Sequence, residues 1–331
     1  MPNYSKISTR VRTLCAVAPV LLASSAFGNT VTILTNTVGD VGNTANIADN
    51  GGGIFGAVNY QYSIGRYEVT NAQYTSFLNA KAATDSHDLY SAGMAGEFGG
   101  IVRSGSAGSY AYSTVSGRES WAVNHVSFWD AARFTNWLEN GQGNGDTETG
   151  TYTLGGVTNP TNASVTRSSG ATWAITSENE WYKAAYYKGG GPNAGYWLYP
   201  TQSNAVSKAM ANYGQWAPDA LNRPTAVGSY SYSSGYGAFD MGGNVWEWNE
   251  SMLDRDPPSM LDRRDHRGLR GGSFFEDLPN ALTSEYRGNY DPSLTNYTIG
   301  FRVSQIPGPG PLAALVLGSL LTRGRRREAA S

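Results

Sequence analysis

Three short segments of this chain carry the signals of a helix start, and stretches rich in Gly, Asn and Thr separate them. In two segments a hydroxyl residue is followed three positions later by an acid or an amide, which is the spacing of a capping box: Thr70 and Gln73, Ser177 and Glu180. In the third, Ser127 and Asp130 mark a helix start. Apolar residues then recur at helical intervals, so the sequence predicts three short helices, the first from Asn71 to Ala80. A strand is predicted to end at 67–69, and 140–170 is predicted to be a long loop with one hairpin at 151–154.

The composition agrees with a loop-rich fold rather than a helical bundle. The chain contains 41 Gly, 21 Tyr and 9 Trp, while only 15% of its residues are charged. No repeat of fixed period is visible, which argues against a solenoid or a propeller. We therefore expect irregular backbone anchored by many aromatic side chains.

The N-terminal segment, residues 1–28, has the pattern of an export signal peptide. Lys6, Arg10 and Arg12 precede an apolar run at 14–22, and small residues follow at the expected cleavage region. The single cysteine, Cys15, lies inside this segment, so the mature chain is expected to carry no thiol and no disulfide. We expect the mature protein in the periplasm, on the outer surface or outside the cell.

The C-terminal segment, residues 305–331, is predicted to be a sorting tail. It contains the sequence IPGPGP, then the apolar run LAALVLGSLL, then RGRRREAAS. An apolar run of about ten residues is too short to span a bilayer. The tail resembles the PEP-CTERM tails of exported bacterial proteins, although Gly308 stands where their glutamate would be. The alternative is an uncleaved tail that associates transiently with a membrane.

The charge distribution argues against a nucleic-acid partner. Lys and Arg number 24 and Asp and Glu number 26, but many of the basic residues lie in the two terminal segments. The part between them is therefore distinctly acidic and is expected to repel nucleic acid.

The segment FDMGGNVWEW, 239–248, combines Asp240 and Glu247 with glycines that can present backbone carbonyls. Calcium takes several oxygen ligands from carboxylates and carbonyls, so this spacing is chemically suited to a calcium ion. The alternative is a Gly-rich turn in which Trp246 and Trp248 anchor the core.

Six segments in a fixed order resemble one protein family: EVTNAQYTSFL, VNHVSFWDAARFTNWL, ITSENEWYKAAYY, GNVWEW, RGGSF and IGFRV. They are similar to the formylglycine-generating enzyme family, also called the sulfatase-modifying factor family. The resemblance covers 51–304, between an N-terminal extension with strands at 29–50 and the tail. It implies a single α+β domain of the formylglycine-generating enzyme fold, C-type-lectin-like and loop-rich, with low regular secondary structure and structural calcium.

The resemblance also implies two calcium sites. The first would use the Asp240 and Glu247 side chains and two carbonyls, those of Gly243 and Val245. The second would use these residues: Asn212, Tyr213 through its carbonyl, Asp219 and Leu221 through its carbonyl.

Catalytic members of this family hold copper with two cysteine thiolates that follow the GGS motif, a soft-ligand site that selects Cu(I). In this chain the first position falls at Glu276 and the second within 279–281, where no cysteine stands. We therefore expect no copper and no conversion of cysteine to formylglycine.

Other positions match residues that line the family's active-site groove, namely Ser273, Trp246 and Arg287. The alternative for Arg287 is an internal salt bridge, which is also the role expected of Arg302 in GFR. Glu276 with the adjacent acid at 277 would be either a ligand pair for a hard metal or simply solvated loop carboxylates.

Two functions follow from this pattern. The first is a non-catalytic, calcium-stabilised module that binds a peptide or a glycan at the cell surface. The second is a metal-dependent oxidoreductase with a non-thiolate site, built from Glu276 and a histidine. The histidines at 87, 125 and 266 form no HxH or HxxxH pair that would support such a site.

Overall fold

The computed structural model describes residues 30–48, 53–214, 222–252 and 266–306. The predicted export signal and nearly all of the predicted sorting tail lie outside these residues, as do Asp219 and Leu221 of the second predicted calcium site. Within the described ranges, no helix is both long enough and apolar enough to cross a membrane.

All three predicted helices are present, and each begins with a complete capping box. Helix α1 spans Asn71–Lys81, α2 spans Phe128–Glu139 and α3 spans Glu178–Tyr186. In each, the side chain of the N-cap residue accepts the N3 amide and the N3 side chain accepts the N-cap amide. Three short 3-10 helices complete the helical content of the described chain: Ala92–Ala95, Asn162–Ser164 and Pro279–Leu282.

Two four-stranded sheets form the centre of the domain. The first has the order β1-β4-β12-β7 and is antiparallel, with bounds Thr35–Val38, Tyr62–Gly65, Val303–Gln305 and Trp173–Ile175. The second has the order β10-β9-β8-β11, with bounds Gly288–Tyr290, Arg267–Arg270, Trp246–Met252 and Ile299–Phe301. In this sheet β11 pairs parallel with β8, and the other pairs are antiparallel. Since β12 ends at Gln305, the folded domain includes the first residue of the segment assigned to the tail.

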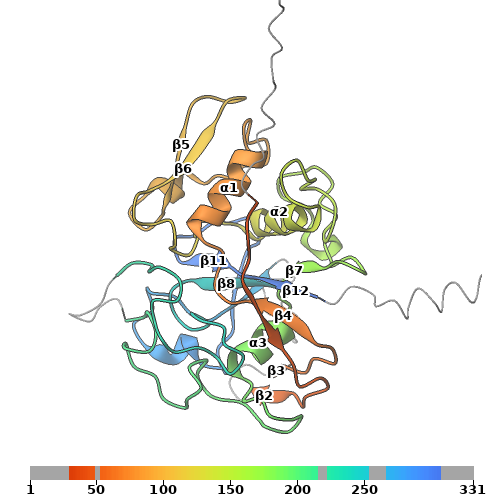
Figure 1. The fold of residues 1–331 in the computed structure, drawn as a ribbon, viewed down its shortest axis with the longest axis vertical. Coiled ribbons are helices and arrows are strands. Elements are labelled where there is room, and N and C mark those ends of the chain that lie inside the picture. Colours follow the sequence, from red (N-terminus) through yellow and green to blue (C-terminus); the bar gives the residue numbers. More distant parts are fainter. Residues whose placement is uncertain (1–29, 49–52, 215–221, 253–265, 307–331) are drawn as a thin grey trace, which may run out of the picture.

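Two hairpins lie apart from these sheets. One joins β2, Asn46–Ala48, to β3, Gly53–Phe55, and the other joins β5, Ile101–Ser104, to β6, Ala111–Thr114. Figure 1 shows α1, α2 and the β5–β6 hairpin at one end of the molecule, α3 with β2 and β3 at the other, and the sheets between them.

Two local predictions were wrong. No strand forms at 151–154, because this loop is held by α2 instead of pairing with itself: the Tyr152 amide donates to Asn136 Oδ1 at 2.8 Å and the Asn136 amide donates to the Tyr152 carbonyl. The strand predicted to end at 67–69 is β4, which ends at Gly65.

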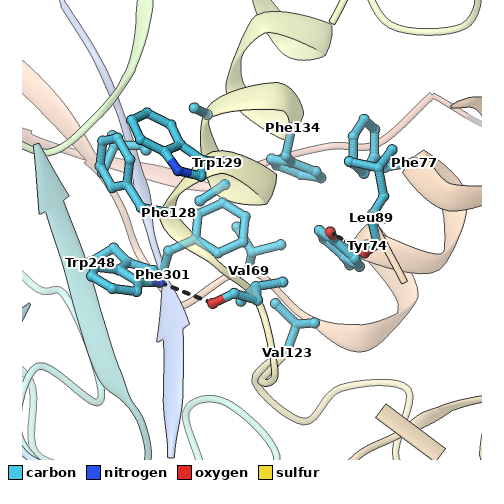
Figure 2. Packing of buried hydrophobic residues seen from close by; sticks show 14 of the residues in the cluster. Val69, Tyr74, Phe77, Leu89, Val123, Phe128, Trp129, Phe134, Trp248 and Phe301 are labelled. Carbon is cyan, nitrogen blue, oxygen red and sulfur yellow. Dashed lines mark hydrogen bonds between the residues drawn. The ribbon is translucent and has the colours of Figure 1, made fainter. Parts of the chain in front are cut away.

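The main core is aromatic and lies between α1, α2 and the strands β8 and β11. Figure 2 shows Tyr74, Phe77, Phe134 and Phe301 packed ring against ring, with centroids of Phe134 and Phe301 5.4 Å apart. Trp248 is fully buried, and its indole N–H donates to the Val126 carbonyl at 3.0 Å. Edge-to-face ring pairs of this kind add to the burial energy, so the few regular elements are held mainly by aromatic packing.

Candidate functional site

The GGS turn carries Ser273 to the start of β8. Gly271 and Gly272 have φ angles of 100° and 74°, a region that favours glycine, and a Cβ at Gly272 would lie 2.7 Å from Leu282. The turn after β9 therefore requires glycine for both its conformation and its close packing.

Three of the four predicted groove residues meet at this turn. The indole N–H of Trp246 donates to Glu276 Oε1 at 2.9 Å, and the hydroxyl of Ser273 donates to the same oxygen at 3.3 Å. Ser273 is fully buried, while Trp246 and Glu276 are half-buried. The ring of Tyr286, which sequence reasoning missed, lies 5.7 Å from that of Trp246 and is 41% exposed.

Glu276 is therefore not a simply solvated loop carboxylate, as one reading of the sequence held. Burial raises the pKa of its carboxyl, the hydrogen bonds from Trp246 and Ser273 lower it, and the neighbouring charge of Asp277 raises it. Asp277 itself is exposed, so the two adjacent acids lie in different surroundings.

Arg287 belongs to a different cluster. Its guanidinium forms an ion pair with Glu178 at 2.5 Å, and the guanidinium of Arg270 contacts the same carboxylate at 2.6 Å. Tyr286 packs on Trp246 while the next residue, Arg287, pairs with Glu178. The salt-bridge interpretation of Arg287 is thus confirmed.

The second position expected for a copper thiolate lies in the 3-10 helix Pro279–Leu282. Ala281 and Leu282 of this turn are buried in a small apolar cluster with Tyr213. The segment therefore contributes packing beneath the turn rather than a side chain with metal-binding chemistry.

The first predicted calcium segment surrounds a buried ion pair. Glu247 is fully buried and accepts hydrogen bonds from Arg302 Nε at 2.6 Å, Arg302 Nη2 at 2.6 Å and Trp181 Nε1 at 2.7 Å. Arg302 also donates to the carbonyls of Gly65 and Phe239, so the structural salt bridge predicted for it is confirmed.

More carboxylates than guanidinium groups lie in this cluster. Burial raises the pKa of Glu68 well above its usual range, the charges of Asp240 and Glu247 raise it further, and Arg302 lowers it. Burial also raises the pKa of Asp240 to about 6, against the lowering effects of the Gly228 amide and Arg302. Sequence reasoning missed Glu68, which stands two residues before the N-cap Thr70 and carried no signal of its own in the sequence.

These residues fit calcium in donor type and charge. A carboxylate has about four acceptor directions, and Glu247 uses three of them. The segment of the second predicted site lies against the first, since the Asn244 amide donates to the Asn212 carbonyl at 3.0 Å. No group of three or more His, Cys, Asp or Glu side chains in the described chain is arranged to hold a metal ion, and the predicted set draws partly on backbone carbonyls.

The histidines lie elsewhere. Burial lowers the pKa of His125 to about 4, and its ring lies 6.4 Å from that of Tyr297. His87 lies 3.6 Å from Glu148, and His266 shares a 2.7 Å hydrogen bond with Asn289. None of these contacts involves Glu276.

The two sheets, the capped helices and the GGS turn beside the start of β8 define a loop-rich α+β domain of the formylglycine-generating enzyme type, C-type-lectin-like in fold. The chain belongs to the sulfatase-modifying factor enzyme 1-like domain family, whose model matches residues 56–305.

Two curated relatives show the range of the family. Hercynine oxygenase of Mycolicibacterium smegmatis is 36% identical over 140 residues, 37% of this chain and 31% of that protein. The bovine protein named inactive C-alpha-formylglycine-generating enzyme 2 is 28% identical over 145 residues, 41% of this chain and 45% of the other. The chain thus spans less than half the length of these relatives.

Solved structures agree on the fold. Treponema denticola variable protein 1 superposes with a TM-score of 0.54 and 18% identity, covering 85% of this chain and 97% of the other. CarF superposes with a TM-score of 0.53 and 19% identity, covering 84% and 100%.

Proposed function

We propose that this chain is an exported, non-catalytic member of its family, a calcium-stabilised module that binds a peptide or a glycan at the cell surface. The observation that carries the proposal is the environment of Glu276. The carboxylate at the expected first thiolate position accepts hydrogen bonds from Trp246 and Ser273 and so belongs to a defined polar surface. The names of the relatives do not decide the question, because one is an oxygenase and another is called inactive.

Copper chemistry of the family's kind needs soft ligands. A carboxylate is a hard ligand that favours other ions, and the only cysteine in the chain is Cys15. What remains is a surface with an indole, a carboxylate and a partly exposed phenol ring, which is the composition of a binding site.

Calcium is part of the proposal as a structural ion. Asp240, the carbonyls of Gly243 and Val245, and the remaining acceptor direction of Glu247 would hold it. The ion would offset the negative charge that Glu68, Asp240 and Glu247 carry in excess of Arg302, and it would brace the loops before β8.

Export, and sorting or membrane association through 305–331, rest on the sequence pattern alone. They locate the proposed module outside the cytoplasm, where calcium is available to a structural site.

The test is mass spectrometry of a sulfatase-type cysteine peptide incubated in air with the mature protein and Cu(I). We expect no aldehyde product above a no-protein control, and a catalytic family member serves as the positive control. Glu276→Cys should also be inactive, because one thiolate cannot hold Cu(I) in a two-thiolate geometry. A copper-dependent aldehyde product from the unaltered chain would make the protein an enzyme and end the proposal.

A further inference from the structure

The Glu276 carboxylate has an open oxygen on a partly exposed surface. Its Oε1 accepts from Trp246 and Ser273, whereas within the described residues no donor reaches Oε2. Among those residues no Lys or Arg side chain forms an ion pair with Glu276, and the adjacent charge is the acid Asp277. A half-buried carboxylate without a counter-charge is electrostatically suited to a cation.

The aromatic rings beside this carboxylate favour the same kind of ligand. Trp246 and Tyr286 have centroids 5.7 Å apart and planes inclined by 41°, so the two rings contact each other and leave no room for a cation between them. The faces of Trp and Tyr attract cations through their quadrupoles, and Trp is the strongest of the aromatic side chains in this respect. The hydrogen bond from the Trp246 indole to an anionic carboxylate polarises the ring further in that direction.

The geometry distinguishes between types of cation. A guanidinium binds a carboxylate most strongly through two parallel hydrogen bonds, which needs both oxygens. At Glu276 one oxygen already accepts two protein hydrogen bonds, so a single oxygen remains. An ammonium group is a compact charge that requires only one acceptor and can also lie against a ring face.

We propose that the surface formed by Trp246, Glu276 and Tyr286, with the buried Ser273 hydroxyl holding Glu276 from beneath, binds a primary ammonium group, with Glu276 Oε2 as acceptor and the two rings as cation–π partners. The inference rests on the proposed binding function and names its ligand class. The ammonium belongs either to a lysine side chain of a peptide or to a free alkylamine.

The experiment follows the indole N–H signal of Trp246 in ¹⁵N-labelled mature protein, assigned with the Trp246→Phe variant. The probes are n-butylammonium, a short peptide with one lysine, the same peptide with that lysine acetylated, and glucose. We expect saturable shifts with the first two probes, with Kd on the order of 1 to 10 mM. Tighter binding of the lysine peptide than of n-butylammonium would identify a peptide ligand, and equal binding would identify a free amine.

Variants test the assignment of each group. Glu276→Gln keeps an acceptor for Trp246 and should weaken ammonium binding by about tenfold, because the charge is lost. Tyr286→Ala should weaken it by about threefold, since a cation–π contact at a partly exposed ring is worth up to about 1 kcal/mol. Tyr232→Ala is the matched control, as Tyr232 is 46% exposed and Tyr286 is 41% exposed.

Two results would overturn the proposal: equal binding of the lysine and acetyl-lysine peptides, or no shift of the Trp246 signal with n-butylammonium at 50 mM, about fivefold or more above the expected Kd. If glucose or the acetylated peptide shifts the signal instead, the surface binds neutral ligands, so this inference fails while the binding function stands. Formation of aldehyde in the copper assay would remove the binding function itself, whatever the titration shows.

Discussion

The structure contains two tryptophan–glutamate pairs that look alike in their central hydrogen bond and differ in everything around it. Trp181 donates its indole N–H to Glu247 at 2.7 Å, and Trp246 donates its indole N–H to Glu276 at 2.9 Å. Glu247 is fully buried and also accepts hydrogen bonds from Nε and Nη2 of Arg302. Glu276 is half-buried and has no cationic partner among the described side chains.

The difference follows from where each pair lies in the fold. Arg302 stands between β11 of one sheet and β12 of the other, and its guanidinium forms an ion pair with Glu247 on β8. The Trp181–Glu247 pair therefore joins helix α3 to both sheets. The Trp246–Glu276 pair joins β8 only to the loop after the GGS turn.

The comparison predicts its largest effect at Arg302. Arg302→Met would leave Glu68, Asp240 and Glu247 buried together without a cationic side chain, and we expect a loss of about 3 to 5 kcal/mol in the free energy of unfolding when it is measured with a chelator present. Urea unfolding of the variant and the unaltered chain at neutral pH measures this loss.

If Arg302→Met fails to fold, the double variant Arg302→Met with Glu247→Gln should recover part of the loss, because it removes both charges of the pair. A loss below about 1 kcal/mol in the single variant would show that Arg302 does not neutralise this cluster.

Calcium binding tests the same cluster of Glu68, Asp240 and Glu247. An ion that binds only the folded state should stabilise it by about 2.7 kcal/mol at a hundredfold excess over Kd. We expect the melting temperature to rise with calcium and fall with chelator, and the response to be much smaller in Asp240→Asn. Asp240→Asn is a more specific test of calcium binding than a change at Glu247, because Glu247 also forms the ion pair with Arg302.

Asp88→Asn, at an exposed position, should respond to calcium as the unaltered chain does. Equal responses in Asp240→Asn and the unaltered chain would remove the first calcium site, and an unaltered chain insensitive to calcium would remove structural calcium altogether.

Much of the scaffold could be predicted from the sequence because its signals are local. A capping box needs only two residues three positions apart, and both predicted boxes form; the helix start predicted at Ser127 and Asp130 forms a third. The role of Arg302 was also predictable, through the family resemblance. The absence of a hairpin at 151–154 could not be predicted, because the side chain of Asn136 on α2 hydrogen-bonds the backbone of Tyr152.

The candidate site was only partly predictable, since its geometry depends on which way neighbouring side chains point. Trp246, Ser273 and Glu276 meet, as their match to the family's groove positions suggested. Arg287 instead forms an ion pair with Glu178, while the residue before it, Tyr286, packs on Trp246. Trp181 and Glu68 also enter through long-range contacts. No local pattern distinguishes such partners before the chain is folded.

The smallest expected effect belongs to Glu276. Because burial raises the pKa of its carboxyl above the usual 4.5, the folded state holds the proton more tightly than the unfolded state does. Its contribution to stability is therefore complete below pH 4.5 and is lost as the pH rises through the higher pKa of the folded state. Glu276→Gln has no such dependence, so at pH 8 it should be slightly more stable than the unaltered chain.

The difference should vanish at pH 4, and Glu119→Gln, at an exposed position, is the control for the loss of one carboxylate. Adding n-butylammonium at ten times its Kd should reverse the order at pH 8, because binding would stabilise the unaltered chain by about 1.4 kcal/mol and the variant, which binds about tenfold more weakly, by only about 0.4 kcal/mol. A binding residue differs from a structural one in that its carboxylate lowers the stability of the free protein and raises it only when a cation is bound. If Glu276→Gln is instead less stable at pH 8 with and without the amine, Glu276 holds the loop as Glu247 holds the sheets, and the two pairs are alike after all.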